Sequence, residues 1–437
     1  MNLDLTYWMH TQDKLTWIAC TVGLIVIYGC IYLFLDLPPD MSDFPMVNPI
    51  RTLLGGIATG LITAQALIFT ITLVAAQLNA RYSHSMITRV FTWPTALLMG
   101  LYMFSSLYAM VTLAALSLRP SNFLISLPFG MPPIHPVAIS LSLAATCLIL
   151  LLPYLWSFKR ILNPEHMARY ESHRLLKQLR SENILTAEET STLDNITMSA
   201  FSYRDYKTYE TGFNLLCHLA LHSWKQSSVT SAETIQRSLV EITISCLDDP
   251  RAPRISIEAL RRLGEDVASS SLPEGARQIL IGLSEIGEIS VGRKDVSLTR
   301  ALCLVISDLG ELGAENRLGT LAEESAYSLG RIGSIASSTG LEDLTRQIVA
   351  YTRRVGYRSS NNGQHLGTSQ ALSSLWLIGG TTSSHMYETS KTVARELEML
   401  ELSTSIEQVD RAYNSIPVNA GIEAFRAYYL ANIRDNR

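Results

Sequence analysis

Four long stretches without charged residues constrain what the first third of this 437-residue chain can fold into. They span residues 15–35, 52–80, 94–118 and 137–158. Each is long enough for a helix that crosses a hydrocarbon core of about 30 Å, which takes about 20 residues. Only five of the 35 Lys and Arg residues and five of the 39 Asp and Glu residues precede Lys159. The sequence therefore predicts a four-span transmembrane domain over residues 1–158, and it excludes a single soluble globular enzyme.

Basic residues beside the predicted spans indicate their orientation, because short cytoplasmic loops carry an excess of Lys and Arg. Arg81 and Arg89 lie between the second and third spans, and Lys159 and Arg160 follow the fourth. Both segments are expected in the cytoplasm, with the loops 36–49 and 119–136 outside. The predicted protein is multi-pass, lies in the cell (inner) membrane, and has both termini in the cytoplasm.

The second span carries a polar stripe. At 100° per residue, its members fall within an arc of about 40°, and they are Thr52, Thr59, Thr63, Thr70 and Gln77. Gln65, Thr72 and Asn79 lie on the nearly opposite side. Hydroxyl and amide groups can replace part of the hydration shell of an ion, so the first stripe is a candidate pore lining. The alternative is that these side chains only hydrogen-bond to neighbouring helices in a packed bundle.

Further residues bear on the pore interpretation. Gly56 and Gly60 form a GxxxG pair beside the stripe, which allows another helix to approach closely. The outer mouth of the pore would contain three acids, Asp36, Asp40 and Asp43, which raise the local cation concentration. The inner mouth would contain two bases, Arg81 and Arg89. Because the two mouths have opposite charge, the selectivity stays open.

The run Phe69-Thr-Ile-Thr-Leu-Val-Ala-Ala-Gln-Leu78, followed by Arg89-Val90-Phe91, resembles prokaryotic predicted membrane proteins catalogued as domain of unknown function number 2254. The resemblance implies an N-terminal multispan region and a cytoplasmic C-terminal domain. Family members have a Ser-Pro-Gly-Ile-Asn-Asp-Pro motif in the C-terminal part, and the nearest segment here is Cys246-Leu-Asp-Asp-Pro250.

Glycines recur every 23 residues in the C-terminal part, each directly after a branched apolar residue. They are Gly264, Gly287, Gly310, Gly333, Gly356 and Gly379. A fixed period of this kind indicates an internal repeat, and 23 residues hold one helix of about 15 to 17 residues plus a turn. We expect the glycines to allow close packing of helices rather than to cap them.

The predicted fold is therefore all-α. It consists of the transmembrane domain (1–158), a helical linker region of about three helices (159–250), and a solenoid-like cytoplasmic repeat domain (251–437). With a formal net charge of −4, the chain lacks the cationic surplus of a nucleic-acid binder.

Chemical motifs are sparse. His218 and His222 share a helical face beside Cys217, but a metal site would need further ligands, and the neighbouring leucines favour an ordinary packed helix. The cluster Tyr203-Arg-Asp-Tyr-Lys207 is typical either of an interface or of a solvated aromatic face. No nucleotide-binding or hydrolase motif is present, so we expect no enzyme activity, no metal and no cofactor.

These features favour a homo-oligomeric channel for an inorganic ion in the lipid bilayer. Its second span would line the path, and its cytoplasmic domain would assemble or gate it. No Asp, Glu, Lys, Arg or His lies inside a span, which argues against a proton relay. The alternative is a membrane-anchored scaffold that presents the repeat array to a cytoplasmic protein partner and transports nothing.

Overall fold

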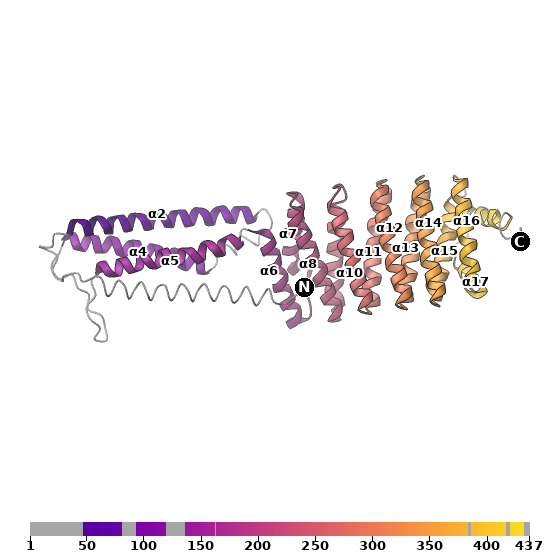
Figure 1. Cartoon of the computed structure of the whole chain (residues 1–437), viewed down its shortest axis with the longest axis horizontal. Coiled ribbons are helices and arrows are strands. Elements are labelled where there is room, and N and C mark those ends of the chain that lie inside the picture. The colour runs from indigo at the N-terminus through magenta and orange to yellow at the C-terminus, as the bar shows by residue number, and fades with distance from the viewer. Residues whose placement is uncertain are drawn as a thin grey trace. The chain divides into compact units, whose positions relative to one another are not determined.

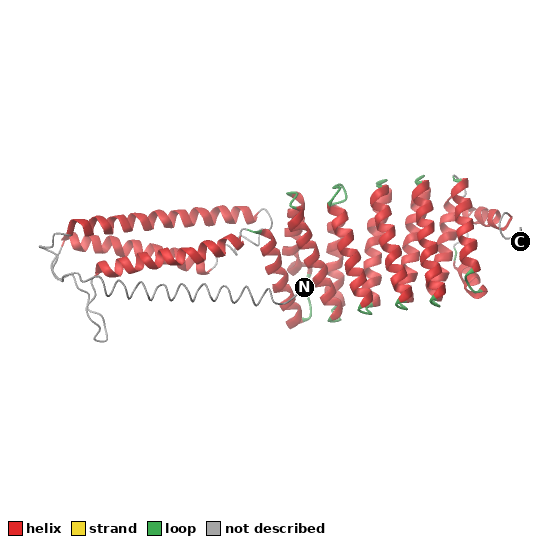
Figure 2. Cartoon of the chain, in the orientation of Figure 1, coloured by secondary structure: helices red, strands yellow, loops and turns green. Residues whose placement is uncertain are grey.

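The computed structural model describes residues 47–80, 93–118, 136–161, 163–382, 386–416 and 420–431. Within these ranges the chain forms sixteen helices. The part of the chain coloured in Figure 2 contains helices and loops and no strand. The chain divides into two compact units, Met1–Met167 and Ala168–Arg437. The two units are described separately below. The all-α class predicted from the sequence is confirmed for the described residues.

Three long helices are described in the first unit: α2 (Val47–Ala80), α4 (Trp93–Leu118) and α5 (Pro136–Ile161). They correspond to the second, third and fourth uncharged stretches, and the first stretch (15–35) lies outside the described residues. Helices α2 and α4 are long and apolar enough to span a membrane, and α5 contains a shorter described apolar stretch, Pro136–Leu151. Helix α2 is continuous over 34 residues, about 51 Å at 1.5 Å per residue.

Helix α4 packs against both α2 and α5. The largest apolar cluster joins all three helices through Leu61, Ile68, Leu98, Tyr102 and Cys147. The Tyr102 hydroxyl is buried but donates a hydrogen bond of 2.9 Å to the Cys147 carbonyl oxygen. Large apolar side chains on the other faces stay exposed, such as Leu67 on α2 and Met103 on α4. This distribution suits a bundle whose outer surface meets lipid.

The second unit is an array of paired helices. Its members are α6 (Pro164–Glu182), α7 (Ala187–Ser202), α8 (Tyr206–Lys225), α9 (Val229–Ser245), α10 (Ala252–Ser269), α11 (Pro273–Gly292), α12 (Val296–Glu315), α13 (Gly319–Ser338), α14 (Glu342–Asn361), α15 (His365–Thr382), α16 (Tyr387–Leu402), α17 (Ile406–Ser415) and α18 (Ala420–Tyr429). From α8 to α16, each helix packs on the next helix and on the one after it, so alternate helices form two layers (Figure 1). Four helices, rather than about three, lie between residues 164 and 245.

The 23-residue period is exact in the structure. Helices α11 to α15 begin at Pro273, Val296, Gly319, Glu342 and His365. Helices α11 to α14 each contain 20 residues, so the expected length of 15 to 17 was too short, and only three residues connect successive helices. The middle residue of each connection has a positive φ, and the five positions are Ser271, Lys294, Arg317, Gly340 and Gly363. This conformation reverses the chain within three residues.

The repeat glycines provide space for a side chain from two repeats later. A Cβ atom at Gly264 would lie 2.8 Å from Leu309 Cδ1, and one at Gly287 would lie 2.7 Å from Ile332 Cδ1. The same relation joins Gly333 to Ile378, at 2.6 Å. In each case the apolar residue is the one directly before the glycine two repeats on. The predicted close packing is therefore confirmed. At Gly264, Gly287 and Gly333 it joins helices of the same layer, whereas a Cβ at Gly310 or Gly356 would also lie against the next helix, at Ser325 or Ala371.

The C-terminal end of the array departs from the period. Gly379 faces the ring of Phe425 on α18 instead of an aliphatic residue. Trp376 packs edge to face against Phe425 and Tyr429, with ring centroids 5.3 Å apart in both cases. These aromatic side chains of α18 cover part of α15, which also packs on α16 and α17.

Substitution of Gly287 by Ala tests the close packing. The added methyl group would overlap Ile332 Cδ1, but Ala is also the better helix former by up to about 1 kcal/mol, so the two effects oppose each other. Gly292→Ala, in the same helix with open space around it, gains the helix propensity alone, so we expect Gly287→Ala to be less stable than Gly292→Ala by about 1–3 kcal/mol. Thermal unfolding of the full chain, followed by helical circular dichroism, measures both effects. Recovery of stability by a second change, Ile332→Val, would support the overlap as the cause, and equal stability of the two glycine variants would contradict it.

Candidate functional site

The predicted pore-lining stripe lies on an uncovered face of α2. All five of its residues, Thr52, Thr59, Thr63, Thr70 and Gln77, are exposed. Three of the hydroxyls donate hydrogen bonds to backbone carbonyl oxygens one turn earlier, as Thr63 does to Thr59 at 2.9 Å. Gly56 and Gly60 are also exposed, and a Cβ added at either would meet nothing within 4 Å. The stripe and the GxxxG pair therefore form one surface of α2 that the described helices α4 and α5 leave open.

The opposite side of α2 faces the bundle. The Thr72 side chain is fully buried, its hydroxyl donates to the Ile68 carbonyl oxygen, and its Oγ1 atom lies 2.6 Å from the Tyr154 hydroxyl of α5. Gln65 is half-buried. The two polar sides of α2 thus differ in environment: Thr72 holds the bundle together, whereas the stripe has no partner helix within the described chain.

Other predicted site residues lie outside the described residues. They are Asp36, Asp40 and Asp43 of the outer mouth and Arg81 and Arg89 of the inner mouth. The side chain of Asn79 is also outside the described part. The charge at the two mouths stays a prediction.

A double-mutant cycle on Thr72 and Tyr154 tests the assignment of the two sides. We expect Thr72→Val and Tyr154→Phe to show a coupling energy of about 0.6–1.7 kcal/mol, the range typical of hydrogen bonds between membrane helices. Thr70→Val is the control, because its hydroxyl bonds only within α2. Its coupling to Tyr154→Phe, measured by unfolding in detergent, should be close to zero. Equal coupling for both threonines would contradict the assignment.

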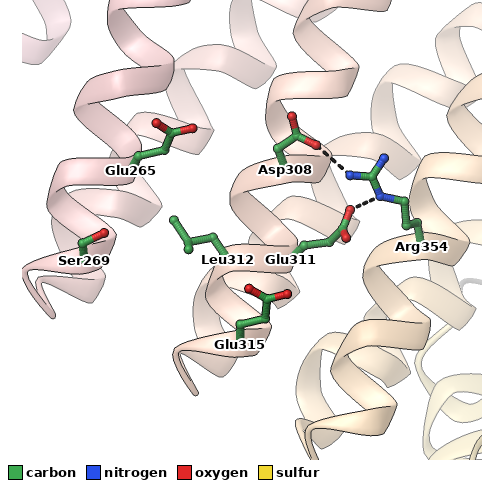
Figure 3. A pocket seen from close by; sticks show the side chains of 7 residues that line it. All are labelled: Glu265, Ser269, Asp308, Glu311, Leu312, Glu315 and Arg354. Atoms are coloured by element: carbon green, nitrogen blue, oxygen red, sulfur yellow. Dashed lines mark hydrogen bonds and ion pairs between the residues drawn. The ribbon is translucent and has the colours of Figure 1, made fainter.

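The repeat array contains an acidic pocket that the sequence did not reveal. It has a volume of about 400 Å³ and is lined by Glu265 and Ser269 of α10, Asp308, Glu311, Leu312 and Glu315 of α12, and Arg354 of α14 (Figure 3). The acids of α12 are spaced three and four residues apart, so they share one helical face. That spacing can be read from the sequence, but which residues of α10 and α14 lie beside these acids depends on how the helices of the array pack.

Ion pairs balance most of the acids in this pocket. Arg354 donates to Asp308 Oδ1 at 2.7 Å and also to Glu311. Burial by itself lowers the pKa of the Arg354 guanidinium, but these two acids outweigh it and the pKa is raised. Arg358 lies 3.4 Å from Glu311, and Arg261 lies 2.5 Å from Glu265. The ion pairs therefore join α12 to α14 across the pocket, whereas Glu265 pairs within its own helix, α10.

Removal of the Arg354 charge tests this network. Glu311 has a nearly buried side chain, so we expect Arg354→Gln to lower the free energy of unfolding by about 1–3 kcal/mol at neutral pH. The loss should shrink at acid pH, where protonated carboxyl groups no longer attract Arg354. Arg300→Gln, an exposed change on α12 without a described ion pair, is the matched control. A loss that is independent of pH in both variants would show that charge is not the cause.

The remaining candidate residues, Cys217, His218 and His222, have surroundings typical of a packed helix. Cys217 is buried, which raises the pKa of its thiol. His218 and His222 stack with ring centroids 6.5 Å apart. No three His, Cys, Asp or Glu side chains of the described residues are grouped so as to hold a metal ion.

The Tyr203–Lys207 cluster forms the turn between α7 and α8. Asp205 caps α8 by accepting the Thr208 amide, and the Tyr206 hydroxyl donates to Asp249 Oδ2 at 2.7 Å. Asp249 also accepts the backbone amides of Arg251 and Ala252 and so orders the start of α10. This part of the cluster joins two turns of the array.

The long apolar helices and the helical array define the class: a membrane protein with a helical-repeat domain. The family described as "Predicted membrane protein (DUF2254)" matches residues 14–209, which confirms the resemblance seen in the second span. No curated protein matches the chain.

Two solved structures are similar to this chain only weakly. A "Circular tandem repeat protein with novel repeat topology and enhanced subunit contact surfaces" is 14% identical, with 88% of each chain covered and a TM-score of 0.36. A chain from "Computational Design of Self-Assembling Cyclic Protein Homooligomers" is 12% identical, with 63% of this chain and 98% of that chain covered and a TM-score of 0.16. At these TM-scores neither structure bears on function.

Proposed function

We propose that the protein is a homo-oligomeric ion channel in the cell (inner) membrane of a prokaryote, with α2 lining the conduction path. Both termini lie in the cytoplasm, and the helical array assembles or gates the pore. The observation that carries this proposal is the exposed Thr and Gln stripe on the face of α2 that the other described helices leave open.

The solvent around α2 determines the energetic cost of its exposed polar groups. Hydrocarbon offers no hydrogen bonds, so an amide such as that of Gln77 is costly when it faces lipid. Thr63 and Thr70 satisfy their hydroxyl protons within α2, but their oxygen atoms keep acceptor capacity that water or a cation can use. Gly56 and Gly60 flank the stripe without covering it, so a second copy of α2 can approach closely there. A conduction path between subunits would give the polar stripe partners other than lipid and would use the close approach of helices at Gly56 and Gly60.

The scaffold remains the second candidate, because the array offers a long helical surface with exposed side chains such as Tyr327 and Tyr357. In that case the stripe joins subunits and carries no ions. The two candidates differ in whether the purified protein conducts.

Ion flux through the full chain in liposomes tests the proposal. We expect Thr63→Leu and Gln77→Leu to reduce flux severalfold at equal incorporation and equal oligomeric state, because each replaces a polar group of the path by a branched apolar one. Ser117→Leu is the matched control: it also removes an exposed hydroxyl that bonds within its own helix, but on α4.

Two results would contradict the channel. Absence of flux above empty liposomes across a range of voltages and pH would favour the scaffold. If all three variants leave the flux unchanged, the conduction path does not run along α2. Ion replacement in a conducting sample would then determine the selectivity.

A further inference from the structure

Helix α6 carries a basic face. His166, Arg169, His173, Lys177 and Arg180 are all exposed. At 100° per residue they fall within an arc of about 80°. The acids of the helix lie off this arc: Glu165 is in the first turn, Glu171 is fully buried and pairs with Arg174 at 2.5 Å, and Glu182 is the last residue. These five residues are called the α6 basic face below.

The cations of this face are unpaired within the described chain. Arg169, Lys177 and Arg180 have no described ion pair, although the array pairs many of its other arginines. The paired set on the repeat helices and their turns comprises Arg261, Arg262, Arg277, Arg293, Arg331, Arg346, Arg353, Arg354 and Arg358. The α6 basic face thus presents positive charge to a partner outside the described chain.

Positive charges near α6 also act on two histidines of α8. Burial, followed by nearby positive charges that include Arg180 and Lys225, lowers the pKa of both His218 and His222. No carboxylate is among the causes for either histidine. A surface with this electrostatic character is complementary to an anion.

The chain itself places α6 close to a membrane. Helix α5 ends at Ile161 and α6 begins at Pro164, and the Asn163 side chain caps the new helix by accepting the Glu165 amide at 3.0 Å. The intervening residues span at most about 10 Å when extended. Lys159 and Arg160 add two further bases at the end of α5. Basic segments directly cytoplasmic of a transmembrane helix attract the anionic lipids of that leaflet.

We propose that the α6 basic face binds anionic phospholipid headgroups of the cytoplasmic leaflet. This inference rests on the membrane placement of α5 in the proposed function but not on conduction, so a sample without ion flux can still bind the lipid. Bound headgroups would fix the first helix of the array against the membrane surface.

Lipid binding by the full chain in neutral detergent tests the proposal. Native mass spectrometry counts the phosphatidylglycerol and phosphatidylcholine molecules retained, over a titration of each lipid. We expect preference for phosphatidylglycerol in the native chain, and about a tenfold or greater loss of its affinity in the triple variant Arg169→Gln, Lys177→Gln, Arg180→Gln. The matched control, Arg237→Gln, Arg254→Gln, Arg300→Gln, removes three exposed charges from the array and should retain native affinity.

Each other outcome would overturn the proposal. Equal affinity for the two lipids, or equal loss in the two triple variants, would mean that the α6 basic face is not a lipid site. Binding of soluble glycerol 3-phosphate as tight as that of the lipid would mean a site for free anions. Circular dichroism of each variant confirms that the comparison is between folded proteins.

Discussion

The contact between a repeat glycine and the apolar residue 45 positions later determines the geometry of the array. Leu309 lies against Gly264, Ile332 against Gly287, and Ile378 against Gly333. Each of these apolar residues directly precedes the repeat glycine that lies two repeats later. One apolar-glycine dipeptide therefore supplies both the side chain that contacts an earlier repeat and the space for a side chain from a later repeat. Any larger residue at the glycine would separate helices of the same layer, and the shift would pass to every following repeat.

Charged side chains follow the same spacing. Arg277 pairs with Glu324, Arg331 with Glu288 and Arg354 with Asp308, across separations of 43 to 47 residues. Such half-exposed pairs contribute little individually. Together they join successive helices of a layer, whereas Arg169, Lys177 and Arg180 of the α6 basic face have no described ion pair.

The membrane region is organised by a difference between the two sides of α2. On one side, Thr72 bonds to Tyr154 and is fully buried. On the other, Thr63 and Gln77 are exposed beside Gly60. A hydroxyl inside a bundle and a hydroxyl on its surface have the same effect on hydropathy but opposite consequences for assembly, because only the second is available to another subunit, to water or to an ion.

The sequence by itself determined the all-α class, the three long described helices of the first unit and the 23-residue period, since uncharged length and fixed spacing are properties of the chain alone. It also identified the polar stripe and the close packing at the glycines. Only the tertiary structure decided that Thr72 faces inward, that the repeat helices have 20 residues, and that Arg354 meets the acids of α12. These outcomes depend on how neighbouring helices are offset, which the one-dimensional pattern does not encode.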